Sequence, residues 1–344
     1  MSLIRQRPRL QIRSHGPKQR KTEQLVKDLT LTGGCLTPEI QLTKPQFPAK
    51  PKAENQGKVY KIGRFLLEHT EGETYKACDC TTGEEKICKE FQIHKYRESL
   101  SAYWLVDAHE NISSISEIIL GETKAYVFFD CHYGDLHSYV RQKKKLKEDE
   151  AANLFRQIVA AVKHCHDSGV ILRDLKLRKF VFKNKERTEL RLDSLEDACI
   201  LEQEDDDRLS DKHGCPAYVS PEILNHNTPT YSGRAADIWS LGVMLYTILV
   251  GRYPFHDAEP TILFSKIRRG QYLLPPSLSS KVKCLLKSVL RQEPDLRLSA
   301  EECLSHPWLN QGSRSNGFVT ISNKFNDQTV PEVVLDTFEH DFFT

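Results

Sequence analysis

The sequence predicts an α+β protein with two lobes, a small antiparallel β lobe followed by a larger helical lobe, between two disordered tails. Three observations support this prediction: short strand-like segments at 59–130, longer segments with helical periodicity from 147 onward, and polar stretches at both ends. The 344 residues are 39% hydrophobic and 28% charged, which is typical of a soluble globular protein. They are enough to bury a sizeable core, as one two-lobed domain or as two small ones.

Residues 1–57 form a predicted disordered arm that is first basic and then rich in proline. Such a composition buries too little apolar surface to offset the entropy lost on ordering. The basic residues that precede the first acidic residue, Glu23, are Arg5, Arg7, Arg9, Arg13, Lys18, Arg20 and Lys21. The arm could be a nuclear address, contact anionic partners, or be a solvated tail. Because the net charge is only +2, we expect no direct nucleic-acid partner.

From residue 58 the pattern changes to that of the small lobe, predicted at 58–130. Strand-forming segments bounded by turns at Gly72 and Gly83 predict strands at 59–67, 73–80 and 85–93. A short helix is expected at 94–106, and a hairpin at 115–120 and 124–130.

The large lobe is predicted at 131–309. Segment 147–167 has an apolar stripe and three acids in its first turn, as a helix should. Segment 235–250 is apolar nearly all round, and we expect it to be a central helix. Its most apolar run, 238–250, is too short to span a membrane, so we expect this run to be buried and expect no membrane partner. Further helices are predicted at 261–269, 278–291 and 300–304, and a flexible tail at 310–344.

The ten cysteines form no C-x-x-C pair, and the N-terminus does not look like a secretory leader. We therefore expect free thiols in a reducing compartment, in the nucleus, the cytoplasm or both, and no metal site.

One segment of the large lobe has the outline of a protein kinase catalytic loop. Leu172-Arg173-Asp174-Leu175, followed by Lys179, fits the pattern H-R-D-L-x-x-x-N, with Asp174 as the candidate base. Lys179 stands where an Asn should bind one magnesium ion. Ser194-Leu195-Glu196 stands where Asp-Phe-Gly should bind the other. These degenerate positions predict that no catalytic residue is functional.

Residues 59–309 resemble a protein kinase domain, and specifically a Tribbles pseudokinase. The resemblance rests on the Ser-Leu-Glu triplet and on the strings GETKAYVFF, LRDLKLRKFVF, SDKHGCPAYVSPEIL, LFSKIRRGQ and HPW. It implies a bilobal protein-kinase-like fold. A base alone contributes about 10²–10⁴-fold to a rate, whereas metal stabilisation of the phosphoryl group contributes several kcal/mol. The loss of the metal ligands should therefore slow phosphoryl transfer more than the retained base, Asp174, could accelerate it.

The nucleotide site is predicted to be vestigial. Lys89 matches the lysine that would hold the nucleotide phosphates, and Glu98 is its candidate helix partner. The three glycines of the glycine-rich loop fall on Leu67, His69 and Gly72, so that only Gly72 survives. We expect ATP to bind weakly or not at all, with no magnesium requirement.

Residues that stabilise the fold are present, in contrast to those that bind metal. Glu222 follows Ser220-Pro221 and should pair with Arg297 inside the large lobe. Asp237 stands where kinases tie the central helix to the catalytic loop. A protein that keeps the fold-stabilising residues of a kinase but lacks its metal-binding residues is expected to act as a binding platform.

The resemblance also implies partners. Asp327, Gln328, Val330 and Pro331 resemble the peptide by which Tribbles proteins recruit a RING-type E3 ubiquitin ligase through its WD40 domain. The region around His306, Pro307, Trp308 and Leu309 is linked in the family to MAP kinase kinases, although a structural core plug is an equal alternative. The acidic run at 202–207 and the Ser-Leu-Glu triplet would border the site for degrons of C/EBP transcription factors. Akt-type kinases are a further expected partner.

The final residues, 338–344, combine three phenylalanines with acids, and we hypothesise that they dock on the small lobe near the helix after Lys89.

The sequence thus predicts an adaptor that joins a ligase to clients and is not an enzyme. Two alternatives remain open: a weak, metal-independent kinase using Lys89 and Asp174, and a nucleotide sensor.

Overall fold

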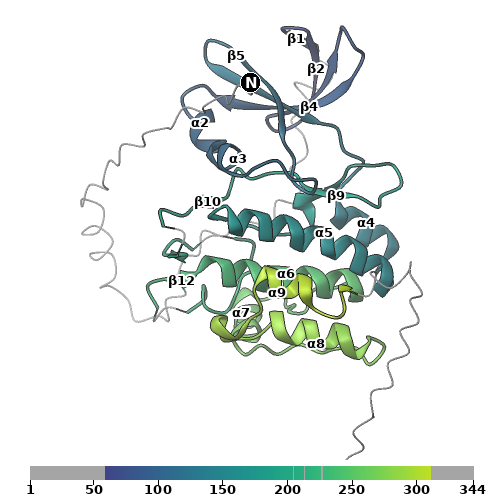
Figure 1. The fold of residues 1–344 in the computed structure, drawn as a ribbon, viewed down its shortest axis with the longest axis vertical. Coiled ribbons are helices and arrows are strands. Elements are labelled where there is room, and N and C mark those ends of the chain that lie inside the picture. The colour runs from purple at the N-terminus through teal and green to yellow at the C-terminus, as the bar shows by residue number, and fades with distance from the viewer. Residues whose placement is uncertain (1–58, 204, 213, 226–227, 311–344) are drawn as a thin grey trace, which may run out of the picture. The chain divides into compact units, whose positions relative to one another are not determined.

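The structure, a computed structural model, describes residues 59–203, 205–212, 214–225 and 228–310. The predicted tails at 1–57 and 310–344 lie outside these residues, apart from Asn310. The small lobe holds a six-stranded antiparallel sheet in the order β1-β2-β3-β4-β6-β5 (Figure 1). Its strands are β1 (Val59–Ile62), β2 (Phe65–Glu71), β3 (Thr74–Asp79), β4 (Glu85–Gln92), β5 (Ile115–Leu120) and β6 (Lys124–Asp130).

The predicted strands and hairpin are confirmed, with two differences. The single strand expected at 59–67 is two strands, because the chain reverses at Gly63, whose φ of +54° is costly for other residues. The single helix expected at 94–106 is two short ones, α2 (Tyr96–Ser99) and α3 (Ser101–Leu105). Leu100 leaves the helical conformation between them, and its fully buried side chain packs against the sheet.

Both faces of the sheet are buried at its centre because successive side chains point to opposite sides. Phe128 joins a cluster on one face with Phe65 and Leu67. Its neighbours Val127 and Phe129 pack on the other face, in a cluster that includes Leu100. The helical segment therefore covers one face of the sheet.

The large lobe is helical, as predicted. Its helices are α4 (Leu136–Lys143), α5 (Glu148–Asp167), α6 (Gly233–Val250), α7 (Pro260–Arg268), α8 (Ser280–Val289) and α9 (Ala300–Ser305). The sequence did not predict α4, which begins after Asp135, whose side chain accepts from the Ser138 amide. It also did not predict short strands that position loops: β7 (Val170–Ile171), β8 (Phe180–Phe182), β9 (Leu190–Leu192), β10 (Cys199–Ile200), β11 (Arg208–Leu209) and β12 (Tyr231–Ser232).

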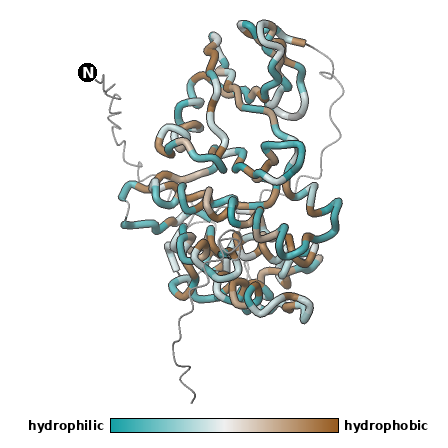
Figure 2. The backbone as a smooth tube through the Cα atoms, turned by 45° about the vertical axis from the view of Figure 1, so that its right-hand side comes forward, coloured by the Kyte–Doolittle hydropathy of each residue, from teal (hydrophilic) through white to brown (hydrophobic). Residues whose placement is uncertain are grey.

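Helix α6 is the core of the large lobe. Among the described residues it is the one helix long and apolar enough to span a membrane, but 83% of it is buried inside the fold. Figure 2 shows hydrophobic and hydrophilic residues interleaved along both lobes. The prediction of a buried central helix is therefore confirmed.

Asp237 on α6 fixes the conformation of the catalytic loop. Its carboxylate is 1% exposed and accepts hydrogen bonds from the amides of Leu172 at 2.8 Å and Arg173 at 2.9 Å. The Nε2 of His166 lies 2.9 Å from the same carboxylate. These bonds hold Arg173 at a φ of +59°, so the turn before Asp174 is set by the core helix.

The Glu222–Arg297 ion pair expected from the sequence is present. Both guanidinium terminal nitrogens of Arg297 donate to the Glu222 carboxylate, at 2.6 and 2.7 Å. The Arg297 side chain is 1% exposed and also lies over the Trp239 ring. Its remaining donors reach backbone carbonyls, so the buried charge is fully partnered.

We expect Glu222→Ala to lower the free energy of unfolding by about 3–5 kcal/mol, because it leaves the Arg297 charge buried without its partner. Urea unfolding followed by circular dichroism measures this change. Asp206→Ala is the control, since it breaks the exposed Asp206–Arg208 pair and should have little effect. Equal losses in the two variants would contradict this role for Glu222.

Candidate functional site

The candidate site lies where the loops after β7 and β9 meet the side chain of Lys89, in the middle of β4. The hairpin of β8 and β9 brings the two degenerate segments together, because the Asp193 amide donates to the Lys179 carbonyl at 2.7 Å. Lys89 reaches the same place from β4 in the small lobe. The structure therefore brings together the predicted residues Lys89, Asp174, Lys179 and Glu196.

Asp174, the candidate base, has two lysines beside one oxygen of its carboxylate. Its Oδ2 lies 2.5 Å from the Lys176 Nζ and 3.9 Å from the Lys179 Nζ. Its Oδ1 is buried and has no hydrogen-bond partner in the described structure. Oδ1 could thus still accept a hydrogen bond, while Oδ2 already has lysine partners within the protein.

The Lys179 ammonium lies between two carboxylates at the position of the metal-binding Asn. Its Nζ is 2.5 Å from the Asp197 Oδ2, and the more distant Asp174 is its second neighbour. The side chain is only 13% exposed. An ammonium group has three donors and no lone pair, so Lys179 cannot ligate a metal and repels a cation at this point. The lysine therefore supplies an internal positive charge in place of a bound one.

The Ser-Leu-Glu triplet is fixed in place by the small lobe. Leu195 is buried, and its amide donates to the Tyr103 hydroxyl on α3 at 3.2 Å. That hydroxyl in turn lies 3.3 Å from the Asp193 carbonyl. Burial, followed by the charge of Glu196, raises the pKa of Tyr103, so the phenol stays neutral and keeps these bonds.

Lys89 is held by carboxylates of the large lobe. Its Nζ is 2.9 Å from the Glu196 Oε1 and 3.5 Å from the Asp193 Oδ2, above the Phe129 ring. Burial opposes the charged form of Lys89, but the charges of Asp193 and Glu196 outweigh it and raise the pKa. The lysine therefore remains an ammonium that Glu196 has already neutralised.

The predicted partner Glu98 does not contact Lys89. Glu98 lies in the single turn of α2 and is exposed, because the helical segment breaks at Leu100. Sequence reasoning missed Asp193, Asp197, Lys176 and Tyr103. The two aspartates directly precede and follow the Ser-Leu-Glu triplet, and this position in the sequence could have identified them as site residues.

The glycine-rich loop is a closed hairpin. Gly72 lies in its turn with a φ of +59°, and the His69 Nε2 lies 2.8 Å from the Gly72 carbonyl. Leu67 lies inside β2 opposite Ala77, and its side chain belongs to the sheet core. Strand pairing therefore places the Leu67 side chain in the core of the sheet, although Leu67 stands at a glycine position of the kinase loop.

The predicted kinase-partner segment is largely interior. Trp308 and Leu309 are buried, and the Trp308 indole donates to the Glu148 Oε2 at 3.1 Å. Only His306 and Pro307 offer accessible surface. This geometry favours the structural alternative for Trp308 and Leu309.

Two other predicted segments lie partly or wholly outside the described residues. Asp327, Gln328, Val330 and Pro331 are among residues that the structure does not describe. In the acidic run, Asp207 caps α6 by accepting from the Ser232 hydroxyl at 2.6 Å and the Arg234 amide at 3.0 Å. Asp207 is thus a structural residue.

Within the described residues no group of three or more His, Cys, Asp or Glu side chains could hold a metal ion.

Comparison with known proteins gives consistent matches. The protein kinase domain family matches residues 60–309. Tribbles homolog 2 of Bos taurus is 57% identical over 299 residues, which cover 86% of this chain and 87% of that protein. Tribbles homolog 1 of Homo sapiens is 58% identical over 322 residues, or 90% and 86% of the two chains. Tribbles homolog 3 of Mus musculus is 49% identical over 83% of this chain and 80% of that protein.

We expect Glu196→Gln to raise the affinity for ATP by about threefold to tenfold, because a phosphate would then compete with one carboxylate fewer for Lys89. Titration of a fluorescent ATP analogue, with magnesium and with EDTA, measures the change. Glu189→Gln is the control, since it removes the same charge at an exposed pair with Lys183. Unchanged affinity in the Glu196 variant would show that this pair does not oppose nucleotide binding.

Proposed function

This chain belongs to the Tribbles family of pseudokinases, and we propose that it is an adaptor that holds a client on its large lobe and an E3 ubiquitin ligase on its C-terminal tail. The proposal rests on a contrast between the residues that stabilise the fold and the residues that line the nucleotide cleft. The anchors of the fold, Asp237 and the Glu222–Arg297 pair, are complete. In the cleft, Lys89 and Lys179 are paired with the protein's own carboxylates.

This contrast weakens the kinase alternative. Phosphoryl transfer depends on positioning and on metal charge at the phosphates, with little other chemistry for the protein to supply. A loss of roughly 5 kcal/mol of metal stabilisation would slow the reaction about 10³–10⁴-fold. The unpartnered Oδ1 of Asp174 is the one observation that favours residual transfer, and it cannot replace that charge.

The proposed ligase site is the peptide of Asp327, Gln328, Val330 and Pro331. An acidic anchor and an apolar Val-Pro pair are suited to a groove such as that of a WD40 domain of a RING-type ligase. The proposed clients are C/EBP transcription factors, which would be ubiquitinated and degraded. Joining the two sites on one chain raises the local concentration of ligase around the client, which is the physical basis of the activity.

Binding and restraint of MAP kinase kinases and Akt-type kinases is a further proposed role. For the segment 306–309, the accessible His306 and Pro307 would carry such contacts. We propose that the protein acts in the nucleus and the cytoplasm, because these reducing compartments keep cysteine thiols free and are where the proposed partners would be met.

The small lobe offers a place where the C-terminal tail could dock. A cavity of about 180 Å³ lies between α3 and the following loop and is lined by Tyr103, Val106 and Leu195. Trp104 and Leu105 beside it are exposed apolar residues. Phenylalanines from 338–343 would cover such a surface, and their release would free the tail for the ligase.

We expect Val330→Ala with Pro331→Ala to abolish capture of the ligase while C/EBP binding is kept, because the two sites are on different parts of the chain. Pull-down of both partners with purified full-length protein measures this. Val333→Ala with Val334→Ala is the matched control in the same tail and should bind both. Undiminished ligase capture by the first variant would remove the tail peptide from the mechanism.

We expect removal of residues 335–344 to increase amide exchange in α2 and α3, because the tail would no longer shield them. Hydrogen–deuterium exchange of the full-length and shortened chains measures this protection. Exchange in α8 is the internal reference. Identical protection of α2 and α3 in the two chains would rule out docking at this surface.

A further inference from the structure

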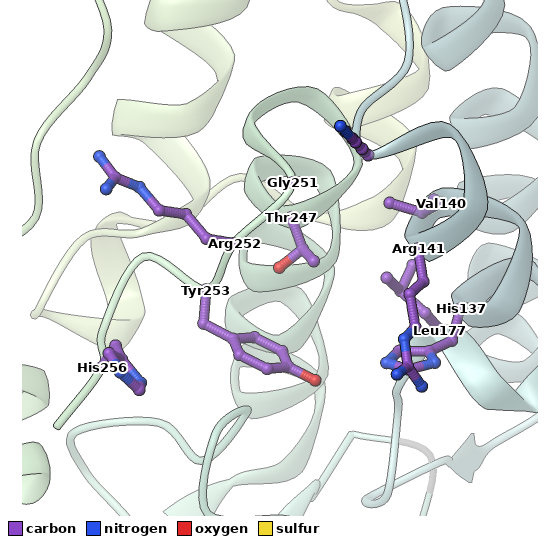
Figure 3. A pocket seen from close by; sticks show the side chains of 10 residues that line it. His137, Val140, Arg141, Leu177, Thr247, Gly251, Arg252, Tyr253 and His256 are labelled. Atoms are coloured by element: carbon purple, nitrogen blue, oxygen red, sulfur yellow. The ribbon is translucent and has the colours of Figure 1, made fainter. Parts of the chain in front are cut away.

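A basic cavity of about 420 Å³ lies on the large lobe, between α4, the catalytic loop and the end of α6 (Figure 3). Its cationic or titratable lining residues are His137, Arg141, Lys144, Arg252 and His256. Among the described residues that line it, none is acidic. Leu177 forms part of the wall, which places the cavity on the same loop as Asp174.

The cations of this cavity are not neutralised by the described part of the protein. No ion pair is found there for Arg141, Lys144 or Arg252, whereas the adjacent Lys143 pairs with Glu150 at 2.7 Å. The His137 Nδ1 is buried and has no hydrogen-bond partner. Burial and then the charge of Arg178 lower the pKa of His137, against a smaller opposite effect of the nearby Asp135. The cavity therefore has an uncompensated positive potential, unlike the nucleotide cleft.

The wall of the cavity is fixed by a close backbone contact. Gly251, at the end of α6, has a φ of +80°, and a Cβ on it would lie 1.9 Å from the Lys144 carbonyl oxygen. Lys144 itself has a φ of +69°, which is costly for a residue with a side chain. The ends of α4 and α6 thus lie in close backbone contact, which places their side chains on neighbouring walls of the cavity.

The placement of the cations indicates the shape of the ligand. In Figure 3, Arg141 and His137 lie on one side of the cavity, Arg252 and His256 lie on the other, and Tyr253 lies between them. A single phosphate is usually recognised by donors that converge on one point. Cations spread over two walls instead complement several negative charges along an extended chain.

We propose that this cavity binds carboxylate side chains of an extended acidic peptide in the client protein. The inference rests on the proposed function, in which a client lies on the large lobe, and it adds the class of client sequence. Acidic residues would enter between Arg141 and Arg252 and balance a charge that the protein leaves unpaired. Exposed ion pairs are individually weak and sensitive to salt, so the cavity would select clients through several such contacts together.

Binding of short synthetic peptides to the full-length protein tests the proposal. The probe is a fluorescent peptide of alternating Glu and Gly, and its neutral match has Gln in place of Glu. We expect the Glu peptide to bind about tenfold or more tightly than the Gln peptide, with an affinity that falls as salt rises. Similar affinities for the two peptides would overturn the proposal.

A charge-reversal pair locates the site. Arg141→Glu with Arg252→Glu should weaken binding of the Glu peptide about tenfold or more, since both side chains are exposed and the fold should persist. Lys281→Glu with Lys287→Glu makes the same change in net charge on α8, outside the cavity, and should have little effect. The basic N-terminal arm is present in every sample. Equal weakening in the two variants would mean diffuse surface attraction and would overturn the proposal.

A third probe distinguishes the ligand class. A glycine peptide with a single phosphoserine should bind more weakly than the Glu peptide, and the reverse order would overturn the assignment to carboxylates. No ligase is present in these measurements. A failure of ligase recruitment would therefore leave them unchanged, and a failure of peptide binding would not affect the pull-down of the ligase.

Discussion

The cleft of this protein is organised by lysine–carboxylate pairs that take the place of a metal clamp. Lys179 lies between Asp197 and Asp174, and Lys89 is held by Glu196 and Asp193. These pairs place the protein's own charges where a kinase would hold a cation and a phosphate, and the Lys89 pairs join the small lobe to the large one. The same pairs occupy the positions at which a kinase would hold nucleotide and metal, in a chain that has the kinase fold and belongs to a family of pseudokinases.

The two lobes are joined at this point by side chains and by a buried phenol. Tyr103 of the small lobe bonds to the backbone at Asp193 and Leu195, next to the residues that hold Lys89. A change in the conformation of the triplet would therefore affect α3 and the surface beside it. The Glu222–Arg297 pair and Asp237 lie within the large lobe. Arg173, whose amide is held by Asp237, connects this frame to the cleft, because its guanidinium donates to the Asp197 carbonyl at 2.8 and 2.9 Å.

Much of the fold could be predicted from the sequence, because strand alternation and the apolar stripes of α5 and α6 are long and regular. The break at Leu100 and helix α4 could not, since single turns and short helices depend on tertiary contacts that leave weak local patterns. At the site, the loss of metal ligands was visible at Lys179 and Ser194. The new partners of Lys89 were not, because Asp193 and Glu196 are brought to it only by the packing of β4 against the hairpin of β8 and β9. For Trp308, burial favours the structural alternative, which the motif alone could not do.

Whether internal cations replace the metal clamp can be measured by calorimetric titration of the full-length protein with ATP, with and without magnesium, combined with an assay of phosphate transfer. We expect that magnesium does not increase the affinity for ATP and that any phosphate transfer is equally slow in the wild-type protein and in the Asp174→Asn variant. A marked increase in affinity with magnesium, together with turnover that the Asp174→Asn variant loses, would contradict this expectation.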